Sequence, residues 1–445
     1  MREFDVVVLG GSAAGIQAAI TAKRSYPEKS LLVVRKEEKV LIPCGIPYIF
    51  GTLGSPDKNL IPDAILANNN VELLLAEATK IDKENKILHT SEGEIKYEKL
   101  VLGTGSRPVV PPIPGIDKKG VYSVEKDVSY LSGLQEELKN AKNVVVIGGG
   151  FIGVEFADEI NKIDSKNVTV VEMAEHCLSL AYDTEFCIEM EEYLVSRGVN
   201  VKTKSMVKEI IGNGKVENVV LASGEKIEAD IVILGIGASA NVELAKEAGL
   251  AIGTTGGIQT DRTLKTSEAD IFACGDCSEK ISFFGGSTSS LKLASIACSE
   301  GRVVGANLYG IKRQSEGTIG VWSTAVGDKA IATAGLTEAV AKNMGYDVVV
   351  AAVEGPNRHP GNLPGASKIK LKVVFERKSG VLLGGQVMGD SIAGEIVNVI
   401  AACVQNRMSA NDISMMQIGT HPMLTASPLV YNLVNVADMA MAKMA

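Results

Sequence analysis

Two stretches of the chain share one pattern of apolar and polar positions. Each contains a short aliphatic run, Val6-Val7-Val8-Leu9 after Asp5 in the first stretch and Val144-Val145-Val146-Ile147 in the second. A glycine-rich turn follows each run, and a helical pattern then extends to about Lys23 and about Ile163. A continuous apolar run of this length is typical of a parallel strand that is covered on both faces. The pattern therefore predicts a strand, a tight turn and a helix twice.

The similarity between the two stretches continues downstream. Further strands are predicted at residues 31–34 and 167–171, and the segment 100–108 (LVLGTGSRP) is echoed by 231–239 (IVILGIGAS). Each of these echoed segments follows a polar, hairpin-like region, at 81–96 and 207–226. Matching segments in the same order predict two homologous α/β domains.

The pattern changes from about Gly317. Strands are predicted at 330–333, 347–353, 369–376 and 382–388, followed by apolar helices at 392–404 and 427–441. Strands grouped before helices indicate an α+β module, and this one has no nucleotide signature. We therefore predict two Rossmann-like dinucleotide-binding domains and a C-terminal α+β domain suited to a subunit interface. The predicted boundaries are 1–115 and 241–316 for the two parts of the first domain, 116–240 for the second domain and 317–445 for the third.

The glycine-rich turns carry the first candidate chemistry. Gly10-Gly11-Ser12-Ala13-Ala14-Gly15 is a dinucleotide fingerprint with serine at its second glycine position, and Gly148-Gly149-Gly150-Phe151-Ile152-Gly153 has all three glycines. A tight turn that leads into a helix N-terminus places backbone N–H groups against a pyrophosphate. Both stretches are therefore predicted to bind a dinucleotide.

The residue that ends the next strand differs between the two stretches. Glu172 occupies this position in the second stretch, where a carboxylate accepts from ribose hydroxyls and repels a 2′-phosphate, so NAD is predicted over NADP. Arg35 occupies it in the first stretch, and a guanidinium suits a phosphate better than a ribose. Either the backbone and Glu37 or Glu38 hold the ribose there, or Arg35 points away.

The segment 40–50 (VLIPCGIPYIF) places one cysteine, Cys44, between an apolar run and a predicted helix start. Pro47 suits the first turn of a helix, and Gly45 allows a sharp turn with room for a planar group beside the sulfur. The positive end of a helix favours a thiolate. A buried structural cysteine is the alternative, and the two predicted dinucleotide domains favour the redox interpretation.

Composition limits the class of protein. The chain has 445 residues, a net charge of −8 and seven scattered cysteines, an odd number. These features argue against nucleic acid as a partner and against a secreted disulfide framework, so a reducing, cytoplasmic setting is predicted. No apolar run is long enough to span a membrane. The pair Cys274 and Cys277 flanks Gly275-Asp276, and no second Cys-x-x-Cys exists for zinc, so no metal is predicted.

These motifs together resemble the FAD-dependent pyridine nucleotide–disulfide oxidoreductases over essentially the full length. The resemblance rests on Gly10/Gly15, Cys44-Gly45-Ile46-Pro47-Tyr48, Thr104-Gly105, Gly148/Gly150/Gly153 with Glu172, and Gly275-Asp276. It is strongest to the single-cysteine branch, which includes coenzyme A disulfide reductase, NADH oxidase and peroxidase, and NAD(P)H-dependent sulfur or polysulfide reductases. The resemblance implies FAD in the first domain, NADH (with NADPH as an alternative) in the second, and a homodimer formed by the third.

The resemblance and the fingerprints together predict the site residues. For FAD these are Gly10, Ser12, Ala13, Ala14, Gly15, Arg35, Lys36, Pro43, Thr104, Gly105, Ser106, Arg107, Gly275 and Asp276. For NAD they are Gly148, Gly150, Phe151, Ile152, Gly153, Glu172 and Gly237. Cys44 is the predicted nucleophile and redox thiol. The pair His421-Pro422 resembles the acid–base histidine of the two-cysteine relatives, which is contributed across the dimer; a packing histidine is the alternative.

Departures from the relatives separate the candidate functions. No histidine follows Gly10, as one does in the oxidase and peroxidase relatives, and the segment 361–365 (GNLPG) lacks the tyrosines of coenzyme A disulfide reductases. We therefore predict an enzyme that uses NADH to reduce a disulfide, persulfide or polysulfide through FAD and Cys44. The substrate would be a small sulfur compound, with coenzyme A or its persulfide as candidates. The alternatives are an NADH oxidase or peroxidase that cycles Cys44 through sulfenic acid, and a redox sensor or electron carrier for a protein partner.

Overall fold

The computed structural model describes residues 1–444 and divides the chain into two compact units. Met1–Pro112, Gly120–Ala141 and Ile236–Thr318 form the first unit. Ile113–Lys119, Lys142–Gly235 and the chain from Ile319 onward form the second. The predicted second dinucleotide domain and the C-terminal module thus share one unit, whereas residues 120–141 and 236–240 belong to the first. The finer division into four parts stays a prediction.

A parallel sheet forms the centre of the first unit. Its strands lie in the order β5-β2-β1-β8, with β19 beside β8. They comprise β1 (Arg2–Leu9), β2 (Leu31–Arg35), β5 (Glu72–Leu75), β8 (Gly93–Leu102) and β19 (Ile271–Ala273). Val6, Val7 and Val8 are fully buried, as the continuous apolar run predicts. The predicted hairpin is present as β6 (Ala78–Asp82) and β7 (Ile87–Thr90), but its second arm and the strand at 100–102 are one strand, β8.

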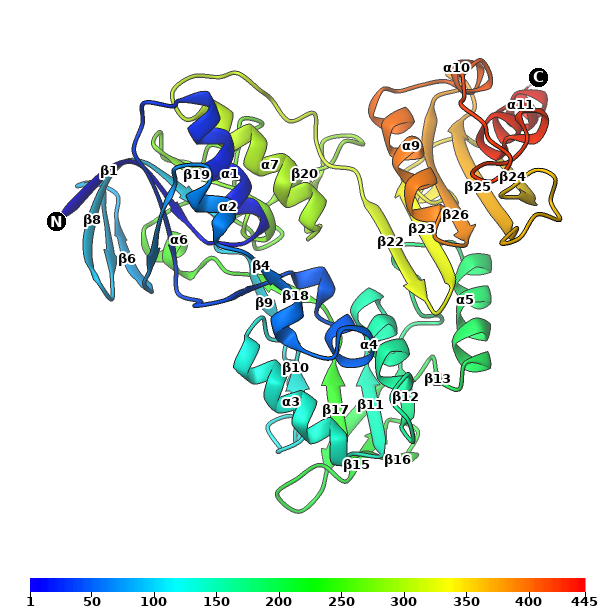
Figure 1. The fold of residues 1–445 in the computed structure, drawn as a ribbon, viewed down its shortest axis with the longest axis horizontal. Helices are drawn as coiled ribbons and strands as arrows, with labels where there is room; N and C mark the ends of the chain where they lie inside the picture. The colour runs from blue at the N-terminus through cyan, green and yellow to red at the C-terminus, as the bar shows by residue number, and fades with distance from the viewer. Residues whose placement is uncertain (445) are drawn as a thin grey trace. The chain divides into compact units, whose positions relative to one another are not determined.

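Helices α1 (Ala13–Ser25) and α7 (Ala294–Asn307) lie side by side against this sheet (Figure 1). Two glycines of α7 allow the close approach. A Cβ on Gly301 would lie 2.7 Å from the Ala14 carbonyl oxygen, and one on Gly305 would lie 2.4 Å from the Ala18 carbonyl oxygen. Helix α7 therefore packs directly on α1 within the first unit.

The remaining elements of the first unit are short, apart from one longer helix. They are β3 (Val40–Leu41), η1 (Pro43–Gly45), η2 (Ile49–Leu53), η3 (Pro56–Lys58), β4 (Leu60–Ile61), α2 (Ala64–Ala67), β9 (Ser106–Pro108), β10 (Val121–Ser123), α3 (Val128–Asn140), β18 (Ala238–Ala240), α6 (Glu243–Glu247), η4 (Gly275–Cys277), β20 (Lys280–Ile281) and β21 (Thr288–Ser289).

The second unit repeats the parallel arrangement in its first half. Strands β17 (Ile231–Leu234), β11 (Asn143–Ile147), β12 (Asn167–Val171) and β13 (Asn200–Lys202) lie side by side in that order. Helix α4 (Phe151–Asn161) follows the glycine turn, and α5 (Thr184–Ser196) precedes β13. A separate antiparallel sheet contains β14 (Val207–Ile211), β15 (Asn218–Leu221) and β16 (Lys226–Glu228).

The C-terminal half of the second unit is an antiparallel sheet with helices packed on it. Its strands lie in the order β22 (Val321–Val326), β23 (Lys329–Gly335), β26 (Leu382–Gly389), β25 (Lys368–Glu376) and β24 (Val348–Pro356). Helix α9 (Ala393–Gln405) packs on β23 and β26, and α11 (Asn432–Met444) packs on β24 and β25 (Figure 1). The shorter elements are α8 (Glu338–Asn343), α10 (Ala410–Ser414) and η5 (Pro428–Val430). The predicted α/β architecture with a C-terminal α+β module is therefore confirmed.

Within residues 1–444, no helix is both long and apolar enough to cross a membrane.

Candidate active site

The two glycine turns share one atomic arrangement. A Cβ on Gly15 would lie 1.9 Å from the Gly10 carbonyl oxygen, and a Cβ on Gly153 would lie 1.8 Å from the Gly148 carbonyl oxygen. Gly10 and Gly148 both have positive φ, at 118° and 104°. The last glycine of each motif is therefore required by the close approach of helix to turn, and the first by the backbone conformation.

The N-termini of α1 and α4 are open toward a ligand. The N-cap of α1 is Ser12, whose side chain makes no capping hydrogen bond, and the N-cap of α4 is Gly150. Backbone N–H groups of a first helical turn have no partner within the helix, and they carry its positive end. An uncapped N-terminus after a glycine turn that has no room for a Cβ fits a pyrophosphate in both units.

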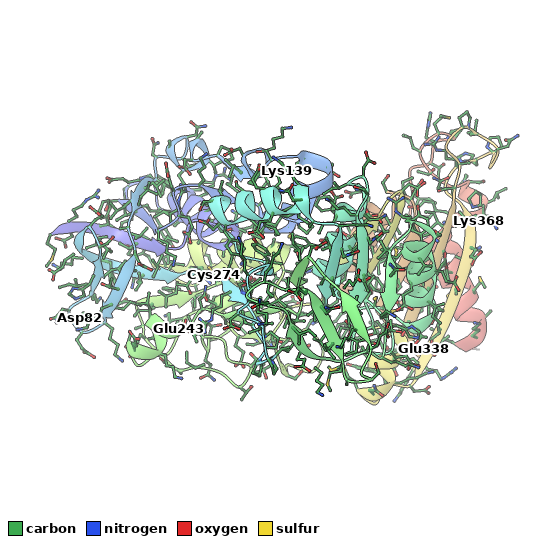
Figure 2. The ribbon with its side chains drawn as sticks, turned by 90° about the horizontal axis from the view of Figure 1, so that it is seen from below. Asp82, Lys139, Glu243, Cys274, Glu338 and Lys368 are labelled. Atoms are coloured by element: carbon green, nitrogen blue, oxygen red, sulfur yellow. The ribbon has the colours of Figure 1, made fainter. Side chains whose placement is uncertain are left out.

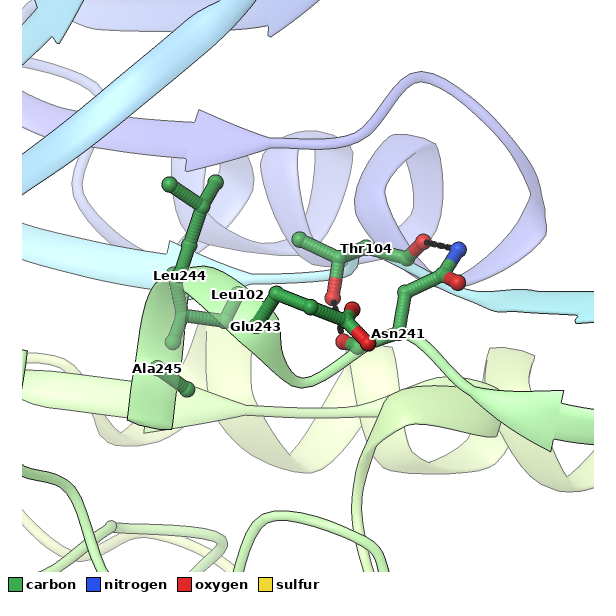
Figure 3. A pocket seen from close by; sticks show the side chains of 6 residues that line it. All are labelled: Leu102, Thr104, Asn241, Glu243, Leu244 and Ala245. Atoms are coloured by element: carbon green, nitrogen blue, oxygen red, sulfur yellow. Dashed lines mark hydrogen bonds between the residues drawn. The ribbon is translucent and has the colours of Figure 1, made fainter. Parts of the chain in front are cut away.

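The ends of the two echoed segments meet in the first unit. Strand β9 pairs antiparallel with β18, and the Thr104 hydroxyl donates to the Asn241 carbonyl at 2.7 Å while the Asn241 amide donates to the Thr104 carbonyl at 2.9 Å (Figure 3). A cavity of about 80 Å³ lies beside this pair, lined by Leu102, Thr104, Asn241, Glu243, Leu244 and Ala245 (Figure 3). Gly105 has a φ of 69°, and its carbonyl accepts from the Asn241 N–H.

Arg107 and Gly237, which are predicted to bind FAD and NAD, lie in or next to the paired strands β9 and β18. Arg107 is exposed and forms an ion pair with Glu243 at 2.6 Å. Gly237, assigned above to the NAD site, belongs to the first unit, where its carbonyl accepts from the Val109 N–H. The other residues assigned to NAD belong to the second unit, so the role of Gly237 stays a prediction.

The structure brings Ser106 and Asp276 together. The Ser106 hydroxyl donates to the Asp276 carboxylate at 2.7 Å, and the Lys126 ammonium donates to the Ser106 hydroxyl at 3.1 Å. Asp276 follows Gly275, which has a φ of 78°. This arrangement holds one carboxylate at the carboxyl end of β19, where the sequence predicts a contact with FAD.

A buried ion pair holds the Gly275 turn. The Glu300 carboxylate accepts from the Gly275 N–H at 2.7 Å and from the Lys280 ammonium at 2.8 Å, and Lys280 also donates to the Gly275 carbonyl. Burial raises the pKa of Glu300. Sequence reasoning missed Lys280, Glu300 and Lys126; the one available signal was a charged residue, Glu300, within the apolar pattern of a helix.

Arg35 has a structural role at the end of β2. Its guanidinium forms a two-bond ion pair with Asp63, at 2.6 and 2.8 Å, and also donates to the carbonyls of Glu37 and Glu38. Its side chain is 1% exposed, and its Cδ lies against Gly11, where a Cβ would be 2.4 Å away. Arg35 therefore points away from solvent. Lys36 next to it is exposed and pairs with Glu77 at 3.3 Å.

Glu172 keeps a defined orientation at the end of β12. One of its carboxylate oxygens accepts from the Gly149 N–H at 2.5 Å, and the other accepts from the Ala174 N–H at 2.6 Å. Two backbone donors thus hold the carboxylate against the glycine turn. A negative charge in this position fits two ribose hydroxyls better than a 2′-phosphate.

Cys44 lies in a loop closed by the short pair of strands β3 and β4. It is the one exposed cysteine of the seven, all of which lie within residues 1–444. The predicted helix start is present as two short helical turns and not as a longer helix: Pro43–Gly45 forms a 3₁₀ turn and Ile49–Leu53 a short π-helical turn. The space beside Gly45 is filled by the side chain of Asn59, whose Oδ1 would lie 2.0 Å from a Cβ at position 45.

Cys274 and Cys277 are both fully buried in the first unit. Figure 2 labels Cys274. The Cys277 thiol donates to the Leu102 carbonyl at 3.3 Å, and burial raises the pKa of both thiols. A buried, protonated thiol is a poor nucleophile. Cys274 and Cys277 therefore differ from Cys44, which is exposed. Within residues 1–444, no three or more His, Cys, Asp or Glu side chains form a group that could hold a metal ion.

His421 lies in a loop of the second unit and is exposed. Its Nδ1 accepts from the Met423 N–H at 3.2 Å, so the neutral ring carries its proton on Nε2. The neighbouring loop is tied to it, because the His359 N–H donates to the Pro422 carbonyl. His421 belongs to the second unit and Cys44 to the first.

We call each glycine turn, together with the helix N-terminus that follows it, a dinucleotide cradle; the two cradles contain residues 10–15 and 148–153. Two such cradles on parallel sheets, with an exposed thiol in the first unit, define a flavin- and nicotinamide-dependent oxidoreductase. The family model for pyridine nucleotide-disulphide oxidoreductases matches residues 4–301, and the dimerisation domain of the same family matches residues 321–429. The chain belongs to the pyridine nucleotide-disulphide oxidoreductase family. It is an NAD(P)H-dependent enzyme of the class that uses FAD.

Similar proteins include both sulfur reductases and oxidases. An NAD(P)H coenzyme A polysulfide/persulfide reductase from Pyrococcus horikoshii is 36% identical over 399 residues, 88% of each chain. An NADH oxidase from Methanocaldococcus jannaschii is 31% identical over 425 residues, 92% of this chain and 93% of that one. The structure of an NAD-dependent persulfide reductase from A. fulgidus matches with a TM-score of 0.92 and 32% identity, over 99% of this chain and 83% of that chain.

Proposed function

We propose that the enzyme uses NADH to reduce a sulfur–sulfur bond in a small persulfide, polysulfide or disulfide, with Cys44 as its redox thiol. One observation carries this proposal: Cys44 alone among the seven cysteines is exposed, and it lies in the unit with the predicted FAD cradle. A persulfide of coenzyme A is the first substrate to test, because a relative is named for that activity.

The proposed chemistry at Cys44 is a thiol–disulfide exchange followed by reduction. The Cys44 thiolate attacks one sulfur of the substrate, a bond forms to Sγ, the substrate S–S bond breaks, and a thiolate leaves and takes up a proton. Two electrons from NADH and a proton then cleave the new bond at Cys44 and release the second thiol. Bound FAD would supply the two-electron chemistry that connects NADH with sulfur.

The residues of the two cradles would hold the cofactors. The open N-terminus of α1, with Ser12, Ala13 and Ala14, would bind the FAD pyrophosphate, and Asp276 would bind the FAD ribityl chain. The N-terminus of α4, with Phe151 and Ile152, would bind the NADH pyrophosphate, and Glu172 would bind its ribose. Thr104, Gly105 and Pro43 would line the flavin side of the first unit.

We also propose a cytoplasmic homodimer in which the partner subunit's His421 protonates the leaving thiolate. A dimerisation domain that covers residues 321–429 supports the dimer. The exposed imidazole of His421 can act as an acid–base group, with its protonated form as the proton donor. Seven cysteines without a disulfide framework suit a reducing compartment.

Anaerobic NADH oxidation with coenzyme A persulfide, polysulfide and coenzyme A disulfide tests the proposal. We expect Cys44→Ser to abolish turnover with every sulfur substrate while the FAD content stays unchanged. Cys298→Ser, at a half-buried cysteine of α7, is the matched control and should keep the activity. Unchanged sulfur reduction by Cys44→Ser would refute the proposal.

An NADH oxidase is the second candidate, because relatives of similar length carry that name. It would cycle Cys44 through a sulfenic acid, which dimedone traps. Fast NADH oxidation in air with dimedone labelling at Cys44, and slow anaerobic turnover with sulfur compounds, would favour this function. The absence of histidine in residues 11–15 argues for the sulfur reductase.

A further inference from the structure

Asn59 contacts the Cys44 turn from a position 15 residues further along the chain. It directly precedes β4, and its backbone carbonyl accepts from the Ile42 N–H at 2.9 Å. Its side-chain amide donates to the Ile42 carbonyl, also at 2.9 Å. Both polar backbone groups of Ile42 are therefore held by one residue.

The Ile42 carbonyl is also the acceptor that closes the Cys44 turn. The Gly45 N–H donates to it at 3.0 Å, which defines the 3₁₀ turn Pro43–Gly45. This oxygen thus accepts from Gly45 on one side and from the Asn59 amide on the other. Because Cys44 lies between Ile42 and Gly45, the direction of its Cα–Cβ bond depends on this shared acceptor.

The Asn59 side chain also contacts the turn sterically. Its Oδ1 would lie 2.0 Å from a Cβ on Gly45, and its Cγ would lie 2.8 Å away. Gly45 does not have positive φ, so its backbone conformation does not require glycine. Position 45 is glycine because the Asn59 amide occupies the space that a side chain would need.

Burial makes the contact specific to an amide. Asn59 is 2% exposed, whereas Ile42 is 45% exposed and Cys44 is exposed. An apolar side chain of the same size would leave the Ile42 carbonyl with one donor fewer, and a carboxylate would repel it. The buried amide is therefore the fixed part against which the exposed thiol is oriented.

We infer that Asn59 is a positioning residue for Cys44: it holds the turn through Ile42 and Gly45, and it thereby directs the thiol toward its reaction partner. This inference rests on the proposed function of Cys44. Positioning of a reacting atom to within about 1 Å can change a rate by about 100-fold. Asn59 thus contributes to the sulfur half of the reaction and not to the nicotinamide half.

The first test compares the two half-reactions in the FAD-loaded protein. In Asn59→Leu and Asn59→Asp, we expect NADH oxidation with the sulfur substrate to fall by about 10- to 100-fold. NADH oxidation with ferricyanide, which takes electrons without needing a thiol, should stay within about twofold of wild type. Asn69→Leu is the matched control, because it removes a similar bond, to the Ile65 carbonyl at 2.8 Å, without touching the turn. An equal fall in both activities, or in neither, would overturn the inference.

The second test uses Gly45→Ala in a double-mutant cycle with Asn59→Ala. The readout is the alkylation rate of Cys44 by iodoacetamide, followed by mass spectrometry of its peptide. Since the added methyl group collides with the amide, Gly45→Ala should change this rate by about fivefold or more with Asn59 present and by less than about twofold in Asn59→Ala. Independent effects of the two substitutions would overturn the inference.

The two tests separate this inference from the proposed function. Wild-type protein that reduces no sulfur compound would refute the proposed function. The alkylation cycle needs no sulfur substrate, so it would still decide whether Asn59 orients Cys44. Normal sulfur reduction by Asn59→Leu, with Cys44→Ser inactive, would refute the role of Asn59 and keep that of Cys44.

Discussion

The two dinucleotide cradles have the same backbone and different chemistry around it. In both, the last glycine leaves less than 2 Å between a hypothetical Cβ and the carbonyl oxygen of the first glycine, at 1.9 Å for Gly15 and 1.8 Å for Gly153. The residues that end the second strands are opposite in charge. Arg35 turns into the protein and pairs with Asp63, whereas Glu172 is held by two backbone N–H groups beside its glycine turn.

The helices that follow the two turns also differ in charge, at one matching position. Two residues after the last glycine, α1 has Gln17, which donates to the Thr21 hydroxyl at 3.0 Å, and α4 has Glu155, which accepts from the Thr324 hydroxyl at 2.7 Å. Burial raises the pKa of Glu155 to about 7. The comparison teaches that the glycine spacing specifies the shape of the turn, whereas the side chains around the turn differ between the two units.

The largest effect is expected from adding a methyl group to either cradle. Gly15→Ala and Gly153→Ala should each cost about 3 kcal/mol of folding free energy, because the Cβ meets a backbone oxygen that cannot move alone. Gly15→Ala should also lose flavin absorbance, and Gly153→Ala should retain flavin but fail to oxidise NADH. Gly133→Ala in α3, where a Cβ meets nothing within 4 Å, is the control and should not destabilise the protein. Loss of the same cofactor in both variants would contradict the assignment of one cradle to each.

The next effect concerns the choice of nicotinamide cofactor. Glu172→Ser removes the charge that repels a 2′-phosphate, so the ratio of kcat/KM for NADH to that for NADPH should fall by about 100-fold. Steady-state kinetics with both cofactors measures this ratio. Glu175→Ser, at an exposed carboxylate nearby in sequence that pairs with Lys204, should leave the ratio within about twofold. A preference for NADPH in the wild-type enzyme would contradict the role given to Glu172.

A smaller effect is expected from the buried cation of the first cradle. Arg35→Met keeps the apolar stem against Gly11 but leaves two carbonyls and Asp63 without their donor, which should cost about 2 kcal/mol of folding free energy. Thermal unfolding in the presence of FAD measures the loss. Lys36→Met, at the exposed neighbour, should change the stability by less than about 0.5 kcal/mol. If Arg35→Met weakened FAD binding without lowering stability, Arg35 would be a ligand contact instead.

The smallest effect is a pH dependence at Glu155 of the second cradle, where the first cradle has the neutral Gln17. The pKa of Glu155 is raised from 4.5 to about 7 in the folded protein, so the folded state holds a proton that the unfolded state has lost between these values. The stabilisation from this group is therefore present below pH 4.5 and is lost as the pH rises toward 7. Glu155→Gln copies Gln17 of the first cradle, and its melting temperature should fall less than that of wild type between pH 5 and 8. Parallel melting curves for the two proteins would contradict the raised pKa.

The local sequence pattern was sufficient to predict those elements whose structure depends on residues close together in the sequence. The apolar runs Val6–Leu9 and Val144–Ile147 form buried parallel strands, and the glycine spacings form the two turns. A strand with no polar face and a turn with no room for a Cβ have few alternatives. The pattern was less specific around Cys44, where the predicted helix start is present only as two short helical turns in a segment that contains Pro43 and Pro47.

The sequence by itself determined two dinucleotide cradles, a C-terminal α+β module and a cysteine in a proline-bounded turn. Only the tertiary structure decided that Arg35 pairs with Asp63, 28 residues away, and that Asn59 fills the space beside Gly45. It also decided that β9 pairs with β18 and that six of the seven cysteines are at least half-buried. The reason is physical: a local pattern specifies which groups must be covered or bonded, but the partner that covers them comes from a distant part of the chain.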